Sequence, residues 1–322
     1  MTQIRLLGFF LVAGIAMGSW FLTCAAWRAD RVMAGARPLE TRSFPRLTVV
    51  TVGTGGAYEN HNRLGPSIAL GLGEDLLLVD AGRGVAEALR GAEIPVAQPA
   101  TVYLSSTLPE NVVGLDDLLL TGWLGGRDQP LRVVGPAGTQ QLVAGLQATH
   151  AAGTAARAAA LGLPEAGARF TALEVGEGWS EARGELTVRA AALPGGPVPA
   201  LAWRFEAGGR AAVVAPTGWA HGPLVDFTRG AQLLVHEAAF IPDAELAEQI
   251  GLDVDPDRLA REAGLHTSID AVGGLASQAG VETLVLVRLR PPPVYDIQIT
   301  GVVDDSFDGR ILVPDDGDEI TP

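Results

Sequence analysis

Residues 47–83 read LTVVTVGTGGAYENHNRLGPSIALGLGEDLLLVDAGR, and this stretch decides the fold. Its apolar and β-branched residues gather in three short runs, LTVVTVG, SIALGL and DLLLV, which are separated by Gly-rich and polar segments. Runs of this length between turn-forming residues predict β-strands. The chain body therefore opens with three strands, and their short connections favour antiparallel pairing.

Downstream of these strands, helical patterns alternate with strand patterns. Residues 84–92 predict a short amphipathic helix, and the alanine-rich residues 138–162 predict a long one because alanine has the highest helix propensity. Strand-like runs continue as far as ETLVLVRL at residues 282–289. This order predicts an α/β (α+β) protein, with sheets covered by helices, in one continuous domain over residues 47–292.

Composition limits the classes of protein that the chain can belong to. With 48% hydrophobic and 19% charged residues over 322 positions, the chain can build a sizeable core and is not of the disordered class. Cys24 is the only cysteine, which excludes an intrachain disulfide. The net charge is −14, and an acidic surface repels phosphate backbones, so we predict no nucleic-acid partner.

The amino terminus carries 22 successive uncharged residues from Leu6 to Trp27. A helix of that length spans about 33 Å, enough for a bilayer core, so residues 1–27 are predicted to be a membrane anchor with a transmembrane helix over 6–27. A cleaved signal peptide is the alternative. Residues 28–46 contain five arginines and two acids and predict a basic juxtamembrane linker.

The side of the membrane is a separate question. The arginines that follow the apolar segment favour a cytoplasmic body, whereas the short tail before that segment is typical of a secretory signal-anchor. We expect a single-pass protein of a bacterial-type inner (cytoplasmic) membrane, with the globular domain on the periplasmic side.

The carboxyl-terminal residues 293–322 are acidic. The segments DDSFDG and PDDGDE lack the full acid, glycine and glutamate spacing of a calcium-binding loop. We interpret this region as a solvated acidic tail with a strand near residues 310–314, and calcium binding remains an open question.

Six segments, in this order along the chain, resemble the metallo-β-lactamase-fold hydrolases, and among these the ribonuclease Z-like branch. They are TVVTVGTGGAYENHNRLGPSIAL, DLLLVDAGRGV, ENVVGLDDLLLTGW, LRVVGPAGTQQLV, GAQLLVHEAAF and HTSIDAVGGLASQAGVETLVL. The resemblance covers roughly residues 47–288. It implies an αββα sandwich, in which two sheets lie face to face with helices outside, and one or two zinc ions held by His and Asp side chains.

The metal-binding positions that the resemblance implies have changed. Where the family has His-x-His-x-Asp-His, this chain has residues 106–111, reading STLPEN. The former ligand positions are Ser106, Leu108, Glu110, Asn111, Gly195, Thr217 and Arg288. Leucine cannot coordinate zinc, and the permanent charge of arginine repels it. We therefore predict no metal, no other cofactor and no catalytic residues of the family type.

Three cleft residues of the family survive, namely His236, Glu237 and His266. Without a metal we favour a structural role for them. Glu110 with Asp116 or Asp117 could form an acid/base couple, but acids at a helix amino terminus also offset the helix dipole, and we favour that interpretation.

These observations predict a catalytically inactive pseudoenzyme that is not an enzyme but a membrane-tethered interaction or scaffold protein, an accessory subunit of a membrane complex with a membrane-associated protein partner. The alternative is a metal-independent hydrolase, or a module that binds an anionic ligand, using the remodelled cleft.

Overall fold

The computed structural model describes residues 17–28, 38–58, 60, 62–215, 222–249, 251, 255–290 and 297–322. The chain divides into two compact units, Met1–Glu40 and Thr41–Pro322. In the first unit, residues 17–28 are helical.

The predicted transmembrane helix is not found in the part of the chain that the structure describes. Within the described residues no helix is both long enough and apolar enough to cross a bilayer. Residues 6–16 of the predicted span lie outside the described residues. This finding contradicts the predicted membrane anchor, the predicted membrane partner and the predicted inner-membrane location with a periplasmic domain.

The second unit contains two seven-stranded sheets. The strands of the first sheet lie in the spatial order β14 (Glu319–Ile320), β1 (Phe44–Gly53), β2 (Ser67–Gly73), β3 (Asp75–Val79), β4 (Thr101–Tyr103), β5 (Leu131–Gly135) and β6 (Phe170–Glu174). As predicted, β1, β2 and β3 pair antiparallel. From β3 to β6 the pairing is parallel.

The second sheet has the spatial order β13 (Arg310–Leu312), β12 (Thr283–Arg290), β11 (Leu233–Ala239), β10 (Arg210–Ala215), β9 (Ala200–Ala207), β8 (Leu186–Leu193) and β7 (Ser180–Arg183). Strands β7 to β10 pair antiparallel, and β10 to β13 pair parallel. The carboxyl-terminal segment therefore contributes β13 to one sheet and β14 to the other.

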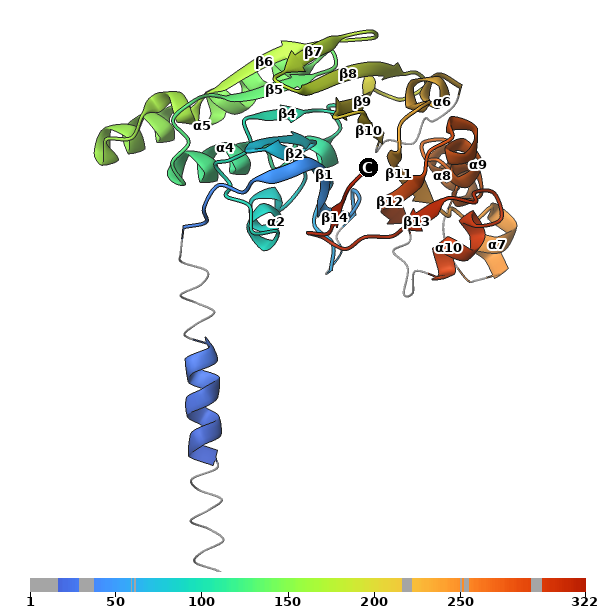
Figure 1. Ribbon diagram of the computed structural model, residues 1–322, viewed down its shortest axis with the longest axis horizontal. Coiled ribbons are helices and arrows are strands. Elements are labelled where there is room, and N and C mark those ends of the chain that lie inside the picture. The colour runs from blue at the N-terminus through green and yellow to red at the C-terminus, as the bar shows by residue number, and fades with distance from the viewer. Residues whose placement is uncertain are drawn as a thin grey trace, which may run out of the picture. The chain divides into compact units, whose positions relative to one another are not determined.

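Helices cover the outer faces of both sheets (Figure 1). Those in the described part of the second unit are α2 (Val85–Gly91), α3 (Pro109–Val112), α4 (Leu115–Leu124), α5 (Thr139–Leu161), α6 (Gly222–Thr228), α7 (Ala244–Gln249), α8 (Pro256–Ala263), α9 (Ile269–Ala279), α10 (Ile297–Val303) and the 3-10 helix η1 (Glu165–Ala168). Alternating side chains of each strand serve two cores. In β3, Leu77 joins the core between the sheets, whereas Leu76 and Leu78 pack under α2 and α4. The predicted αββα sandwich is confirmed.

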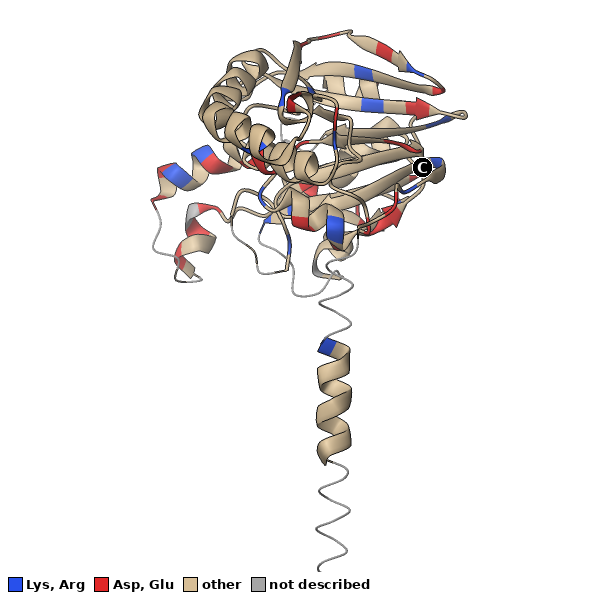
Figure 2. Ribbon diagram, turned by 90° about the vertical axis from the view of Figure 1, so that its left-hand side faces the viewer, with Lys and Arg blue, Asp and Glu red and all other residues tan. Residues whose placement is uncertain are grey.

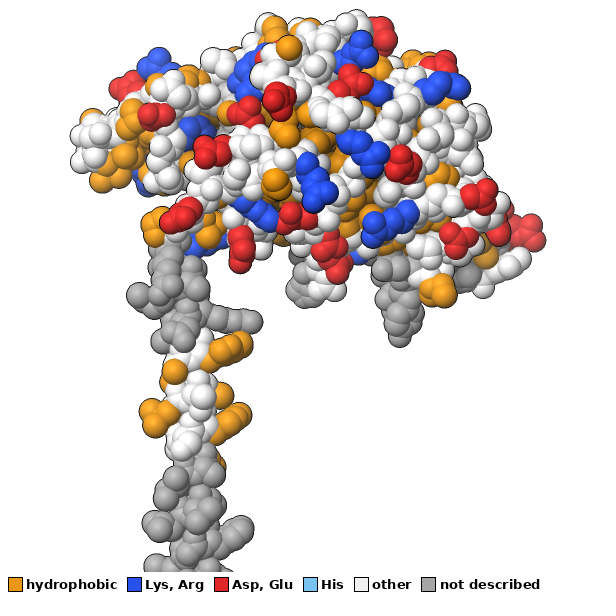
Figure 3. All heavy atoms as spheres, in the orientation of Figure 1, with side chains coloured by type: hydrophobic (Ala, Val, Ile, Leu, Met, Phe, Trp, Pro, Cys, Tyr) orange, Lys and Arg blue, Asp and Glu red, His pale blue; other side chains and the backbone are white. Residues whose placement is uncertain are grey.

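Charged side chains on the strands neutralise one another locally. Arg132 forms two hydrogen bonds with Glu181, at 2.7 and 2.9 Å, and Arg204 pairs with Glu206 at 2.7 Å. Figure 2 shows basic and acidic residues interspersed along the ribbon, and Figure 3 shows the same mixture of side chains on the face that it presents.

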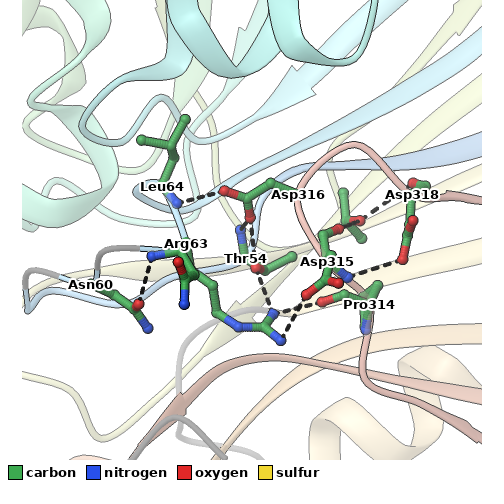
Figure 4. A network of polar contacts seen from close by, with 10 residues as sticks. Thr54, Asn60, Arg63, Leu64, Pro314, Asp315, Asp316 and Asp318 are labelled. Carbon is green, nitrogen blue, oxygen red and sulfur yellow. Dashed lines mark hydrogen bonds and ion pairs between the residues drawn. The ribbon is translucent and has the colours of Figure 1, made fainter. Parts of the chain in front are cut away.

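The acidic carboxyl-terminal segment is folded against the loop between β1 and β2 (Figure 4). Asp316 Oδ1 accepts hydrogen bonds from the amide and the hydroxyl of Thr54, both at 2.7 Å, and Asp316 Oδ2 accepts one from the amide of Leu64 at 2.6 Å. Arg63 donates to the carbonyl of Pro314 at 2.6 Å and to the carboxylate of Asp315 at 3.2 Å. The carboxylate of Asp316 thus fixes both ends of the loop. The interpretation of this segment as a solvated tail, which used composition alone, did not predict these contacts.

Replacing Asp316→Ala removes a charged acceptor from three donors, and hydrogen bonds to charged groups are worth about 1.5–3 kcal/mol each. Because Asp316 is partly exposed, we expect the free energy of unfolding to fall by about 2 kcal/mol, measured by urea denaturation. The matched control is Asp305→Ala, an exposed acid in the same carboxyl-terminal segment, which should change stability by less than about 0.5 kcal/mol. Equal losses in the two variants would contradict the role of Asp316.

Candidate active site

A buried ion pair joins the two sheets. Asp80 directly follows β3 of the first sheet, and Arg288 lies near the end of β12 in the second. Arg288 Nη2 is 2.9 Å from Asp80 Oδ2, and the side chains are 6% and 1% exposed. Both residues have a left-handed backbone, with φ of 62° at Asp80 and 54° at Arg288. Non-glycine residues in that conformation are strained and gather at functional sites.

A β-bulge places Arg288 in this position. The register of β11 against β12 shifts between Glu237 and Ala239, so that Ala238 faces both Arg288 and Leu289. A bulge re-aims the side chain of the extra residue. The amide of Arg288 donates to the carbonyl of Thr54 at 2.7 Å, which ties the bulge to the end of β1.

Hydrogen bonds hold the Asp80 carboxylate from its other sides. The amide and the hydroxyl of Ser105 donate to Oδ1 and Oδ2, both at 2.7 Å. Burial raises the pKa of Asp80 to about 6, although Arg288 and the Ser105 hydrogen bonds oppose that rise. The carboxylate is therefore mostly ionised at neutral pH and balances the charge of Arg288.

Two of the former ligand positions complete this network. Asn111, in α3, accepts from Arg288 Nη2 on its Oδ1 at 2.7 Å. Its Nδ2 donates to the hydroxyls of Ser105 at 3.0 Å and Ser106 at 2.7 Å. Ser106 and Asn111 are fully buried. Both hydrogen bonds of the guanidinium to Asp80 and Asn111 come from Nη2, whereas Nε of Arg288 is buried without a hydrogen-bond partner among the described residues.

A second cluster lies at the end of β11. His266 Nδ1 donates to Glu237 Oε1 at 3.0 Å, and this hydrogen bond raises the pKa of His266 above its usual 6.5. His236 is buried and its pKa is lowered, mainly by desolvation. Its Nδ1 donates to the carbonyl of Glu237 at 2.6 Å, which fixes a neutral tautomer.

A cavity of about 290 Å³ connects the two clusters. It is lined by Arg288, Glu237 and His266, by Glu110 of α3, and by side chains of the β1–β2 loop and of α8. The other lining residues, from these and further segments, are Gly55, Gly56, Ala57, Tyr58, Asn60, Arg63, Leu108, Pro197, Glu262, Leu265, Leu289 and Arg290.

The structure separates the remaining predicted site residues. Gly195 lies in an exposed turn between β8 and β9, with φ of 100°. Thr217 lies outside the described residues. Asp116 accepts from His150 Nε2 at 3.0 Å on the surface of α4 and α5, and Asp117 accepts from Thr121 at 2.8 Å. These two acids thus have local partners of their own.

Sequence reasoning missed Asp80, Ser105 and another arginine of the cavity, Arg290. A signal for Asp80 was present, because an acid directly after the apolar run LLLV ends a buried strand where a sheet edge meets the cleft. Nothing in the local pattern marks Ser105 or Arg290, since their roles depend on contacts between distant segments.

The described residues do not fit a zinc centre of the implied kind. The guanidinium of Arg288 lies at hydrogen-bonding distance from Asp80 and Asn111, so a cation already holds their oxygens. Leu108 has no donor atom, and no three His, Cys, Asp or Glu side chains within the described ranges are grouped closely enough to hold a metal ion. We derive no catalytic step from a metal, and the absence of a cofactor stays a prediction.

Comparisons with known proteins first define the class. The metallo-β-lactamase fold protein YhfI from Bacillus subtilis superposes with a TM-score of 0.66 at 19% identity, covering 85% of this chain and 98% of YhfI. The short form of human tRNase Z superposes with a TM-score of 0.62 at 17% identity, covering 85% of this chain and 98% of that protein. The fold is that of the metallo-β-lactamases. No family model matches the chain.

Sequence relatives define the family. Ribonuclease Z of Mycobacterium sp. (strain KMS) is 30% identical over 249 residues, which cover 76% of this chain and 85% of the relative. Ribonuclease Z of Mycobacterium bovis (strain BCG / Pasteur 1173P2) is 29% identical over 279 residues, covering 84% and 96%. The chain belongs to the ribonuclease Z family, and the predicted resemblance is confirmed.

This membership corrects the functional predictions. Relatives that align over almost their whole length are named as ribonucleases, which contradicts the interpretation of the chain as an inactive scaffold and as a protein that is not an enzyme. It also contradicts the prediction that nucleic acid is not a partner. That prediction took net charge alone as its ground, and net charge does not describe an individual cleft.

Replacing Arg288→Met leaves the Asp80 carboxylate buried without its cation, and breaking a buried pair costs about 3–5 kcal/mol of unfolding free energy. The double variant Arg288→Met/Asp80→Asn removes both charges and should recover at least half of that loss. Chemical denaturation at pH 7.5 measures both variants. A double variant no more stable than the single one would show that the two charges are not coupled.

Proposed function

We propose that this chain is a hydrolase of RNA-type phosphodiester bonds that works without a bound metal ion. The observation that carries the proposal is the guanidinium of Arg288, which takes a fixed place at a cavity that also holds Glu110 and the Glu237–His266 pair. The names of the sequence relatives supply the class of substrate.

Each residue has a chemical role in this proposal. The Arg288 guanidinium is a planar donor with a permanent charge, suited to phosphate oxygens and to the charge that develops on them. Glu110 accepts a proton from the attacking water as the new P–O bond forms. The bond to the leaving oxygen breaks, and that oxygen takes a proton from His266. Glu237 fixes the tautomer of His266, so that Nε2 is the nitrogen that transfers the proton.

The first test is cleavage of a labelled precursor tRNA and of a dinucleotide by the purified full-length chain, with and without EDTA. We expect cleavage that EDTA does not suppress, together with less than one metal ion per ten chains by elemental analysis. Arg288→Lys keeps the charge but loses the fork of donors and should lower the rate about a hundredfold. Arg189→Lys, at an exposed position on β8, is the matched control.

Two results would contradict this proposal. One is the failure of the folded chain to cleave either substrate. The other is cleavage that EDTA abolishes and zinc restores.

The pH dependence tests the role of His266. A general acid must be protonated, so the rate falls as the pH rises through the pKa of His266, which Glu237 raises. Glu237→Gln removes the carboxylate and lowers that pKa, so the alkaline limb of the pH–rate profile should move to lower pH. Glu165→Gln, on the exposed surface, should leave the limb in place. An unmoved limb in Glu237→Gln would show that His266 is not the acid.

A further inference from the structure

We infer that Tyr58, Arg290 and Glu262 form a base-stacking subsite, so that the cavity takes one unstacked nucleotide with its phosphate directed toward Arg288. This inference rests on the proposed function, whose substrate class it narrows. The three residues come from the β1–β2 loop, from β12 and from α8, and all line the cavity.

Contacts among the three residues fix the tyrosine ring. The guanidinium carbon of Arg290 lies 4.2 Å from the centroid of the Tyr58 ring, which is stacking distance for a cation–π contact. Arg290 forms an ion pair with Glu262, and the Tyr58 hydroxyl donates to the same carboxylate at 3.2 Å. Tyr58 nevertheless remains 55% exposed. A ring that is held in place and still exposed is a preorganised surface for another flat group.

The rest of the cavity suits a nucleobase beside a phosphate. Leu108, Leu265 and Leu289 give it apolar walls, whereas Arg288 supplies a cation at one side. Its volume of about 290 Å³ lies near the lower bound of about 300 Å³ for small-molecule pockets, so it accommodates one nucleotide rather than a duplex. Stacking on an aromatic ring accepts any base, because every base has a π-face.

The charges of the cavity favour one nucleotide over a long backbone track. Each arginine of the lining has an acidic partner: Arg63 with Asp315, Arg288 with Asp80, and Arg290 with Glu262. A groove that follows a phosphate backbone needs a stripe of uncompensated cations, and the lining offers none among the described residues. Affinity must therefore come from the base and a single phosphate. That nucleotide is either free or the unpaired end of an RNA strand.

The experiment compares adenosine 5′-monophosphate with ribose 5-phosphate, which lacks the base, by titration calorimetry on the full-length chain. We expect the nucleotide to bind at least about tenfold more tightly. Tyr58→Ala should abolish that difference, Tyr58→Phe should retain it, and Leu161→Ala, an exposed apolar residue on α5, should retain it as well. Equal binding of the two probes, or unchanged nucleotide binding by Tyr58→Ala, would overturn the subsite.

Competition distinguishes the two sources of the nucleotide. If an RNA hairpin with an unpaired 3′ end displaces the nucleotide and a blunt hairpin does not, the natural ligand is an RNA end. If neither hairpin displaces it, the natural ligand is a free nucleotide. Failure of the proposed function is recognised separately. Binding that depends on Tyr58 without any hydrolysis supports the subsite alone, and hydrolysis with binding that is independent of Tyr58 overturns the subsite alone.

Discussion

The ion pair between Asp80 and Arg288 is the interaction on which the site depends. It connects the end of β3 in one sheet to β12 in the other, at the edge where the cavity opens. Asn111 and Ser105 are oriented by the same two side chains, so the loops after β3 and β4 are fixed in one arrangement. Glu237 lies on β11 next to the bulge that places Arg288, and its partner His266 lies in the segment between α8 and α9. The geometry of the cavity therefore follows from one buried guanidinium.

Stability alone does not account for this pair. Burying two charges costs roughly as much as their attraction returns, and apolar replacements of buried pairs are often neutral or stabilising. Here the cost is increased by left-handed backbone at both residues, of order 1–3 kcal/mol each. If the fold required only that this space be filled, leucine or methionine would be sufficient. What the pair provides is a cation held at a fixed place beside the cavity, which is the property that binding of a phosphate requires.

The fold was predictable from the sequence because its determinants are local. Runs such as DLLLV and the alanine-rich stretch of α5 show their own periodicity and propensity, and their order predicts sheets covered by helices. The αββα arrangement of those sheets was implied by the resemblance to the metallo-β-lactamase-fold hydrolases. The site was predictable only in part. The former ligand positions identified Ser106, Asn111 and Arg288. No local sequence pattern indicates the bulge at Arg288 or the ion pair between Arg288 and Asp80. The role of Asp316 depends in the same way on a contact between residues about 260 positions apart.

A guanidinium can take over only part of what a hydrolytic metal centre does. It supplies positive charge and directed donors, but it keeps its protons and cannot generate hydroxide from a bound water near neutral pH. Deprotonation of water then falls to a carboxylate at the cavity, and protonation of the leaving oxygen to an imidazole. Asp80 and Glu262 are already paired with arginines and Glu237 is bonded to His266, which leaves Glu110 as the carboxylate of the described lining to act as base. The carboxylates at the cavity thus differ in their partners, and this difference decides which of them can act as the base.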